Sequence, residues 1–275
     1  ENRVAETIVK RVLKAIERKE VFRVYIVLPQ HPEGDPYEKP LKLIQHYQFR
    51  TLCRGPHSLI SKIEKACLAS GDPEIKAENY IQLLSLRNWG LLANGSVLVE
   101  QIYVHSKMMI IDDTVAIVGS ANINDRSLLG DRDSEIAAFI KDDEMVQSVM
   151  NSEFYLAGRR IRNLRMQLWE EHLGIHPHDH LLKQIITDPA SSETWEYFQY
   201  IVQNNEKCYE NFKLEDTVVV GYEGYPKLDG KWAPDVGKYE KLAGVVGHLV
   251  SYPRGFLEQE DLDRGSLTVI TEVFV

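Results

Sequence analysis

The sequence predicts a mixed α/β fold in which a largely parallel sheet is flanked by helices. Apolar residues recur at helical spacing over residues 4–16, and a nearly continuous apolar run at residues 22–28 follows, stopped by Pro29. Such a run is typical of a strand that is buried on both faces of a parallel sheet. With 44% apolar and 27% charged residues, the 275-residue chain is long enough for one large domain or two small ones.

The remaining elements follow from periodicity and from turn residues. We expect a loop at residues 31–40, a helix at 58–69, strands at 80–86, 101–111, 115–118 and 134–140, helices near 143–150 and at 154–173 and 188–204, a loop at 218–236, and a β-type run at 267–275. Asp112 and Asp113 form the turn between two of these strands. The loop at 31–40 follows a strand, where α/β proteins usually place binding residues.

Composition limits the kinds of protein that the chain can be. The formal net charge of -9 argues against a nucleic-acid binder that works by neutralising phosphates, so we expect no nucleic-acid partner. Cys53, Cys67 and Cys208 are widely spaced, which favours reduced thiols in an intracellular protein. No run approaches the roughly 20 apolar residues of a spanning helix, and no signal or transit peptide is visible. The histidines of residues 176–180 lack a carboxylate or cysteine framework, so we interpret that segment as a surface loop and expect no metal site.

The segment with recognisable chemistry is residues 102–112, which continues to Gly119-Ser120-Ala121-Asn122. On a strand, residues two apart face the same side, so His105 and Lys107 would project into one space. Lysine is almost never fully buried without a partner, which argues against a packing role. The pair indicates a phosphate site, in which Lys107 neutralises non-bridging oxygens and His105 moves a proton near neutral pH.

Other residues of this segment fit the same site. Gly119 allows a ligand to approach the backbone closely, and Ser120 and Asn122 add neutral donors. Asp112 lies at the turn, where it can hold backbone amides or pair with Lys107.

A carboxylate downstream completes the candidate site. Glu135 precedes the next expected strand and is placed to orient His105 or its partner, as the acidic member of a triad does. An isolated His-x-Lys pair occurs by chance in many proteins. The whole pattern H-x-K-x4-D-x6-G-S-x-N is far more specific, and we therefore interpret it as a site.

These residues resemble the HKD signature of the phospholipase D superfamily. The string GSANINDRSLLGDRDSEIA at residues 119–137 is similar to the second HKD motif of eukaryotic phospholipases D that hydrolyse phosphatidylcholine, and Asn-Asp-Arg-Ser within it resembles the branch with PX and PH domains. The resemblance extends to residues 25–29 and 47–55 and to the apolar C-terminal run, and is weakest over 174–240. It implies the phospholipase D/nuclease fold, of which this chain would form one of two pseudo-twofold halves.

The resemblance also implies a mechanism. One histidine attacks phosphorus to give a phosphohistidine, while the other protonates the leaving alcohol and then activates water. The second-motif histidine is usually the acid/base, which gives that role to His105, with Lys107 and Asp112 as the other catalytic residues. Gly119, Ser120, Asn122 and Glu135 would support the phosphate. The implied substrates are phosphatidylcholine and water or a primary alcohol; no cofactor or metal is required, and phosphoinositide activation follows from the family alone.

The sequence departs from the family because it holds no first HKD motif. It also begins without Met, so we expect a C-terminal fragment whose partner is the missing N-terminal half; the alternative is a single-motif protein that dimerises. Residues 1–173 would be the second catalytic half and 174–275 an extension packed on it. We expect a cytoplasmic protein with peripheral membrane contact and no turnover by the chain alone.

Three other interpretations stay open at this stage. The same chemistry would serve a cardiolipin-synthase-like or a nuclease-like phosphodiesterase, although the acidic charge weighs against a nuclease. A non-catalytic membrane module with a dead half-site is a third, but intact His105, Lys107 and Asp112 argue against it.

The basic run at residues 159–165 could contact anionic lipid. We favour its interpretation as a solvated helix face.

Overall fold

The computed structural model describes residues 2–34, 38–93, 95, 97–212 and 239–256 of the chain. Its elements are α1 (Val4–Arg18), β1 (Val24–Val27), α2 (Lys39–Leu52), α3 (Leu59–Ala69), η1 (Ala77–Asn79), β2 (Ile81–Leu91), β3 (Val97–Gln101), β4 (Lys107–Ile111), β5 (Val115–Gly119), α4 (Asp125–Leu128), β6 (Ala137–Lys141), β7 (Met145–Met150), β8 (Glu153–Gly158), α5 (Arg159–His172), α6 (His180–Ile185), α7 (Ser192–Asn211), η4 (Tyr239–Leu242) and β9 (Leu249–Ser251). The expected runs at 218–236 and 267–275 lie outside the described residues.

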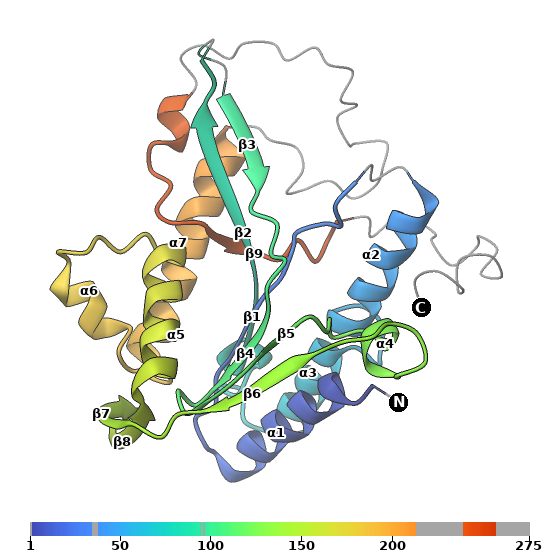
Figure 1. The fold of residues 1–275 in the computed structure, drawn as a ribbon, viewed down its shortest axis with the longest axis vertical. Helices are drawn as coiled ribbons and strands as arrows, with labels where there is room; N and C mark the ends of the chain where they lie inside the picture. Colours follow the sequence, from blue (N-terminus) through green and yellow to red (C-terminus); the bar gives the residue numbers. More distant parts are fainter. Residues whose placement is uncertain (1, 35–37, 94, 96, 213–238, 257–275) are drawn as a thin grey trace.

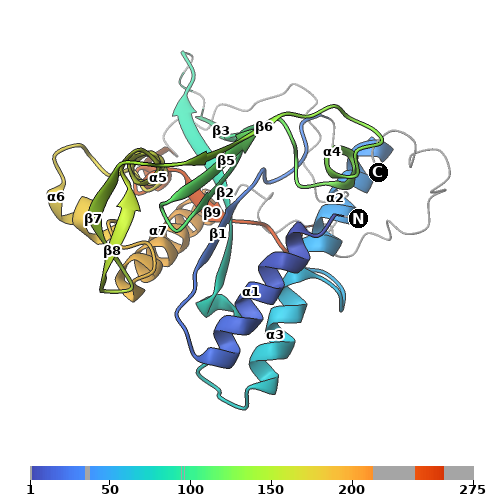
Figure 2. The same cartoon turned by 60° about the horizontal axis from the view of Figure 1, so that its bottom comes forward.

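Strand β2 is the centre of the fold. It pairs with β1 in parallel and with β3 and β9 in antiparallel orientation, and its first seven residues are buried. Ile81 and Leu83 belong to one core, and Leu84 and Leu86 belong to another. Helices α1 and α3 lie on one side of β1 and β2, and α5 and α7 lie on the other (Figures 1 and 2). The strand expected at residues 22–28 is β1, whose four residues are half-buried and pack against both cores, whereas the fully buried strand is β2.

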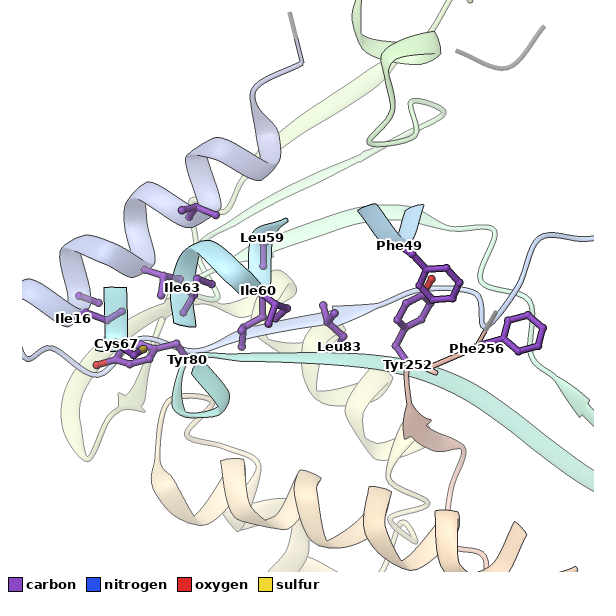
Figure 3. Packing of buried hydrophobic residues seen from close by; sticks show 14 residues of the cluster. Ile16, Phe49, Leu59, Ile60, Ile63, Cys67, Tyr80, Leu83, Tyr252 and Phe256 are labelled. Carbon is purple, nitrogen blue, oxygen red and sulfur yellow. The ribbon is translucent and has the colours of Figure 1, made fainter. Parts of the chain in front are cut away.

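The first core joins α1 and α3 to β2. Its buried residues form a row from Ile16, beside Cys67 and Tyr80, to Phe49 and Tyr252 at the other end (Figure 3). Fully burying one such aliphatic side chain contributes about 1.5–3 kcal/mol. Helix α3 begins where the Ser58 hydroxyl accepts a hydrogen bond from the Ser61 N–H at 3.2 Å. These contacts fix the position of the helices that precede the two parallel strands.

Four aromatic rings build the centre of the second core. Tyr25 packs against Trp169, Trp195 and Phe198, with each pair of ring centroids 4.8 Å apart. The Tyr25 hydroxyl donates to the Pro189 carbonyl at 3.0 Å, so the buried polar tip has a partner. This cluster fixes α5 and α7 against β1.

Most strands that follow β2 are linked by short turns. The order β4-β5-β6 forms a three-stranded antiparallel sheet, and β7 and β8 form a hairpin. Asp112 and Asp113 (φ 48° and 53°) and Asn151 and Ser152 (φ 51° and 65°) adopt left-handed conformations in these turns. Such short turns join antiparallel strands, whereas a parallel pair requires a crossover. The mixed α/β class is confirmed, but the sheet was wrongly expected to be largely parallel, since β1 and β2 form the one parallel pair in the part of the chain that the structure describes.

Several element boundaries differ from the expectation. The helix expected near residues 143–150 is wrong, because Met145–Met150 is the strand β7. Residues 154–158 belong to β8, so α5 begins at Arg159. Helix α2 was missed: its Pro40, interpreted as part of a loop, occupies the first turn of the helix, where proline is tolerated. No described helix is long and apolar enough to cross a membrane.

The last part of the described chain packs on the central sheet. Strand β9 pairs with β2, and the buried Asn205 of α7 donates from Nδ2 to the carbonyls of Val246 and Leu249 at 2.8 and 2.9 Å. These hydrogen bonds hold residues 246–249, which lead into β9, against α7. The boundary drawn at residue 173 stays a prediction.

Candidate active site

His105 lies in an irregular segment, residues 102–106, between β3 and β4. The expected continuous strand over 101–111 is therefore wrong in its middle. Ile102 and Val104 nevertheless pack against the second core, while Tyr103 and His105 are exposed. The Tyr103 and His105 rings lie 6.3 Å apart at an interplanar angle of 30°. His105 therefore lies on the exposed side of this segment.

Lys107 is the first residue of β4 and is half-buried. Its Nζ donates a hydrogen bond to the carbonyl oxygen of His105 at 2.6 Å. This bond holds the ammonium against the backbone of His105. In the sheet, Lys107 pairs with Gly119 of β5.

Gly119 has no room for a side chain. A Cβ at this position would lie 2.4 Å from the carbonyl oxygen of Ile136 and 2.7 Å from Cα of Ala137. The close pairing of β5 with β6 therefore requires glycine here. It also places Ser120, whose N–H donates to the Ile136 carbonyl at 2.9 Å, beside the start of β6.

Glu135 holds two serine hydroxyls. Ser120 donates to one of its carboxylate oxygens and Ser127 donates to the other, the latter at 2.6 Å. The hydrogen bonds from Ser120 and then Ser127 lower the pKa of Glu135, and the positive charge of Lys107 adds to that effect. Glu135 was expected to orient His105 or its partner. The structure instead shows an ionised carboxylate that orients Ser120 and Ser127.

The loop after β5 is held by its own short helix. Asn124 caps α4 by accepting the Ser127 N–H at 2.9 Å, and the Asn122 N–H donates to the Ser127 hydroxyl at 3.2 Å. An ion pair between Arg126 and Asp133 at 2.6 Å closes the loop. Ser127 was not among the expected site residues. Its signal was the Asn-Asp-Arg-Ser run, which has an N-cap residue three positions before a serine.

Asp112 lies at the other end of β4. It follows Lys107 by five positions, which is roughly 16 Å at 3.3 Å per residue. The described ion pairs include none between these two residues, and the Asp112 carbonyl accepts a hydrogen bond from Tyr155 at 2.9 Å. Asp112 as a whole residue is exposed, but desolvation of its carboxyl raises the pKa of that group. The positive charge of Arg11 opposes this rise. Of the two roles open to Asp112, an ion pair with Lys107 is not among the described contacts, and Asp112 lies in the turn as expected.

The neighbouring Asp113 forms a buried ion pair that the sequence did not indicate. Arg165 donates from Nε and Nη2 to its two carboxylate oxygens at 2.8 and 2.7 Å, and the two side chains are 5% and 2% exposed. Arg165 Nη1 also donates to the Ile186 carbonyl at 2.6 Å. The interpretation of residues 159–165 as a solvated basic face is therefore wrong for Arg165, which instead fastens the β4–β5 turn to α5.

Comparison with known proteins identifies the family. The family model described as Phospholipase D matches residues 1–225. The chain belongs to the phospholipase D family. It is 46% identical over 177 residues to Phospholipase D A of Dictyostelium discoideum, covering 64% of this chain and 14% of that protein. It is 36% identical over 295 residues to Phospholipase D zeta 1 of Arabidopsis thaliana (95% of this chain, 26% of that protein) and 38% identical over 279 residues to Phospholipase D2 of Bos taurus (95% and 28%).

This phospholipase D family chain thus spans between about a seventh and just over a quarter of the length of these relatives. Its candidate site residues divide into three groups. The residues at one end of the β4–β6 sheet are His105, Lys107, Gly119, Ser120 and Glu135. Asn122 lies in the loop after β5, where its N–H donates to Ser127, and Asp112 lies at the opposite end of β4.

The first of these groups brings together an ammonium, an exposed imidazole and a carboxylate that accepts hydrogen bonds from two serine hydroxyls. Among the described residues, no cluster of three or more His, Cys, Asp or Glu side chains is arranged to hold a metal ion. All three cysteines are free.

Proposed function

We propose that this chain supplies one half of the active site of a phosphodiesterase that hydrolyses phosphatidylcholine to phosphatidic acid and choline. Membership of the phospholipase D family supports the reaction class. The observation that carries the proposal is the ammonium of Lys107 held beside His105, at the same sheet end as Gly119 and Ser120. An ammonium, a hydroxyl and an imidazole around one exposed space suit a phosphodiester that reacts near neutral pH.

In the proposed mechanism His105 is the acid and then the base. A histidine from the first HKD motif forms a P–N bond as the P–O bond to choline breaks, and His105 gives its proton to the choline oxygen. Water then forms a new P–O bond as the P–N bond breaks, and its proton returns to His105. Lys107 stabilises the charge on the phosphoryl oxygens, and Glu135, which accepts the hydroxyl proton of Ser120, holds the start of the loop beside it.

The incomplete half-site defines the proposed partners. His105 is exposed and its attacking counterpart is absent from the sequence, so the site would be completed by an N-terminal half with the first HKD motif. The other partners would be phospholipid, water or a primary alcohol, and a membrane surface that the protein contacts peripherally from the cytoplasm. The proposed chemistry requires no metal or cofactor and involves no nucleic acid; activation by phosphoinositides and a PX/PH-type arrangement upstream are part of the same proposal.

A chimera tests this function directly. In Phospholipase D2 of Bos taurus, the segment that aligns with this chain is replaced by residues 1–275, and choline release from phosphatidylcholine vesicles is measured. We expect turnover, and phosphatidylethanol when ethanol is present. His105→Ala should reduce both by about 100-fold or more, as is typical for loss of a general acid/base. His178→Ala, which changes an exposed histidine of a loop, is the matched control.

The results that contradict the proposal are specific. A folded chimera in which His105→Ala retains full turnover would remove His105 from the mechanism. Robust turnover by the monomeric chain alone would overturn the half-site argument, whereas turnover that rises with the square of its concentration would favour a single-motif dimer. Cleavage of DNA, or cardiolipin formation from phosphatidylglycerol without choline release, would favour the other phosphodiesterases.

A further inference from the structure

A depression outside the candidate active site lies between α1, α2 and α3. Its volume is about 250 Å³. Its polar lining consists of Glu6, Tyr47, Arg50, Thr51, His57 and Lys62. None of these residues belongs to the cluster around His105, and no step proposed above uses them. The depression therefore requires its own explanation.

The lining carries a surplus of positive charge. Arg50 and Lys62 are permanently charged and His57 adds an imidazole, while Glu6 is the one acid among the lining residues. The Glu6 carboxylate is already engaged by Arg3 at 3.0 Å and by Lys10 at 2.5 Å. The chain as a whole is acidic, with 41 Asp and Glu against 32 Lys and Arg, so a local excess of cations is not a consequence of composition.

The orientation of two helices adds to this charge. Helices α1 and α3 lie side by side and precede the parallel strands β1 and β2 (Figures 1 and 2). Glu6 is in the first turn of α1 and Lys62 is in the first turn of α3, so both N-terminal ends border the depression. A helix N-terminus carries about half a positive charge. The hydroxyls of Tyr47 and Thr51 supply further donors.

We propose that this depression binds the phosphate monoester group of a ligand, as a second anion site separate from the catalytic one. Two cations with neutral donors are the recognition chemistry of a compact, doubly charged oxyanion. The volume is below the roughly 300–1,000 Å³ of pockets that enclose drug-sized ligands, so it suits a headgroup with a few attached carbons. The group can belong to a membrane lipid such as phosphatidic acid or to a soluble phosphate ester.

Binding to the full chain tests the proposal. Because the catalytic cluster also offers a phosphate site, calorimetric titrations with inorganic phosphate and with glycerol 3-phosphate use the Lys107→Ala variant. We expect one remaining site, and Lys62→Glu should weaken it by about tenfold or more. Lys207→Glu makes the same charge change at an exposed lysine of α7 and should alter affinity by less than about twofold. Thr51→Val, which removes a hydroxyl without changing charge, should weaken binding to a smaller extent.

Vesicle co-sedimentation separates the two sources of the phosphate. Binding to phosphatidylcholine vesicles that contain phosphatidic acid, lost in Lys62→Glu and absent without phosphatidic acid, identifies a lipid headgroup. Binding to glycerol 3-phosphate alone identifies a soluble ester. The proposal is overturned if no phosphate binds in the Lys107→Ala background, or if Lys62→Glu and Lys207→Glu, both folded by circular dichroism, weaken binding equally. These measurements do not depend on turnover, so a failure of the proposed reaction would not change their interpretation.

Discussion

Replacing Arg165 with methionine should strongly destabilise the protein. Arg165 and Asp113 are 5% and 2% exposed, so the substitution leaves a carboxylate without its cation in a place that water does not reach. Removing one partner of a buried ion pair costs about 3–5 kcal/mol. The carbonyls of Ile186 and Thr187 also lose their donors, at 2.6 and 3.2 Å, which puts the expected loss in the upper half of that range.

Urea unfolding followed by circular dichroism measures this loss as a change in the extrapolated free energy of unfolding. Arg160→Met is the matched control, because Arg160 is an exposed arginine of the same helix and should change stability by less than about 0.5 kcal/mol. The double variant Asp113→Leu/Arg165→Met should lose less than the sum of the two single losses, since no unpaired charge remains. A loss below about 1 kcal/mol for Arg165→Met would refute the assigned role of the pair.

Three further predictions concern the site and its surroundings. Gly119→Ala should cost about 1–3 kcal/mol and reduce choline release by the chimera, because the new methyl group meets the Ile136 carbonyl; an unchanged melting temperature and rate would contradict this. Ser127→Ala should lower choline release and cost about 1–3 kcal/mol of stability, since it removes a hydrogen-bond partner of Glu135 and of the Asn122 N–H; unchanged turnover would exclude a role in the site. Burial lowers the pKa of His172, and the nearby imidazole of His248 lowers it further. The unfolded state therefore binds the proton more tightly, and stability should fall as the pH drops below about 6.5. His172→Asn should flatten this dependence of the melting temperature on pH, and an equal slope in both proteins would be the opposite result.

The candidate site residues that lie together could be predicted from the sequence because they are close along the chain. His105 and Lys107 are two residues apart, and Gly119 and Ser120 are joined to them through one hairpin, so spacing along the chain nearly determines their distance. The mixed α/β class is confirmed for the same reason: helical periodicity and apolar runs are properties of short segments. The prediction of a helix near residues 143–150 was wrong because an apolar segment of this length is compatible with either the helical or the strand periodicity.

Contacts between distant segments were decided by tertiary structure. The sequence placed Asp112 in the catalytic group, but β4 carries it to the opposite end of the sheet from Lys107. Arg165 reaches Asp113 across 52 positions, and three separate helices line the cationic depression. No local pattern encodes such contacts, because they depend on which faces pack together once the whole core forms. The residue types of the site could thus be read from the sequence, whereas the partner that holds each of them required the fold.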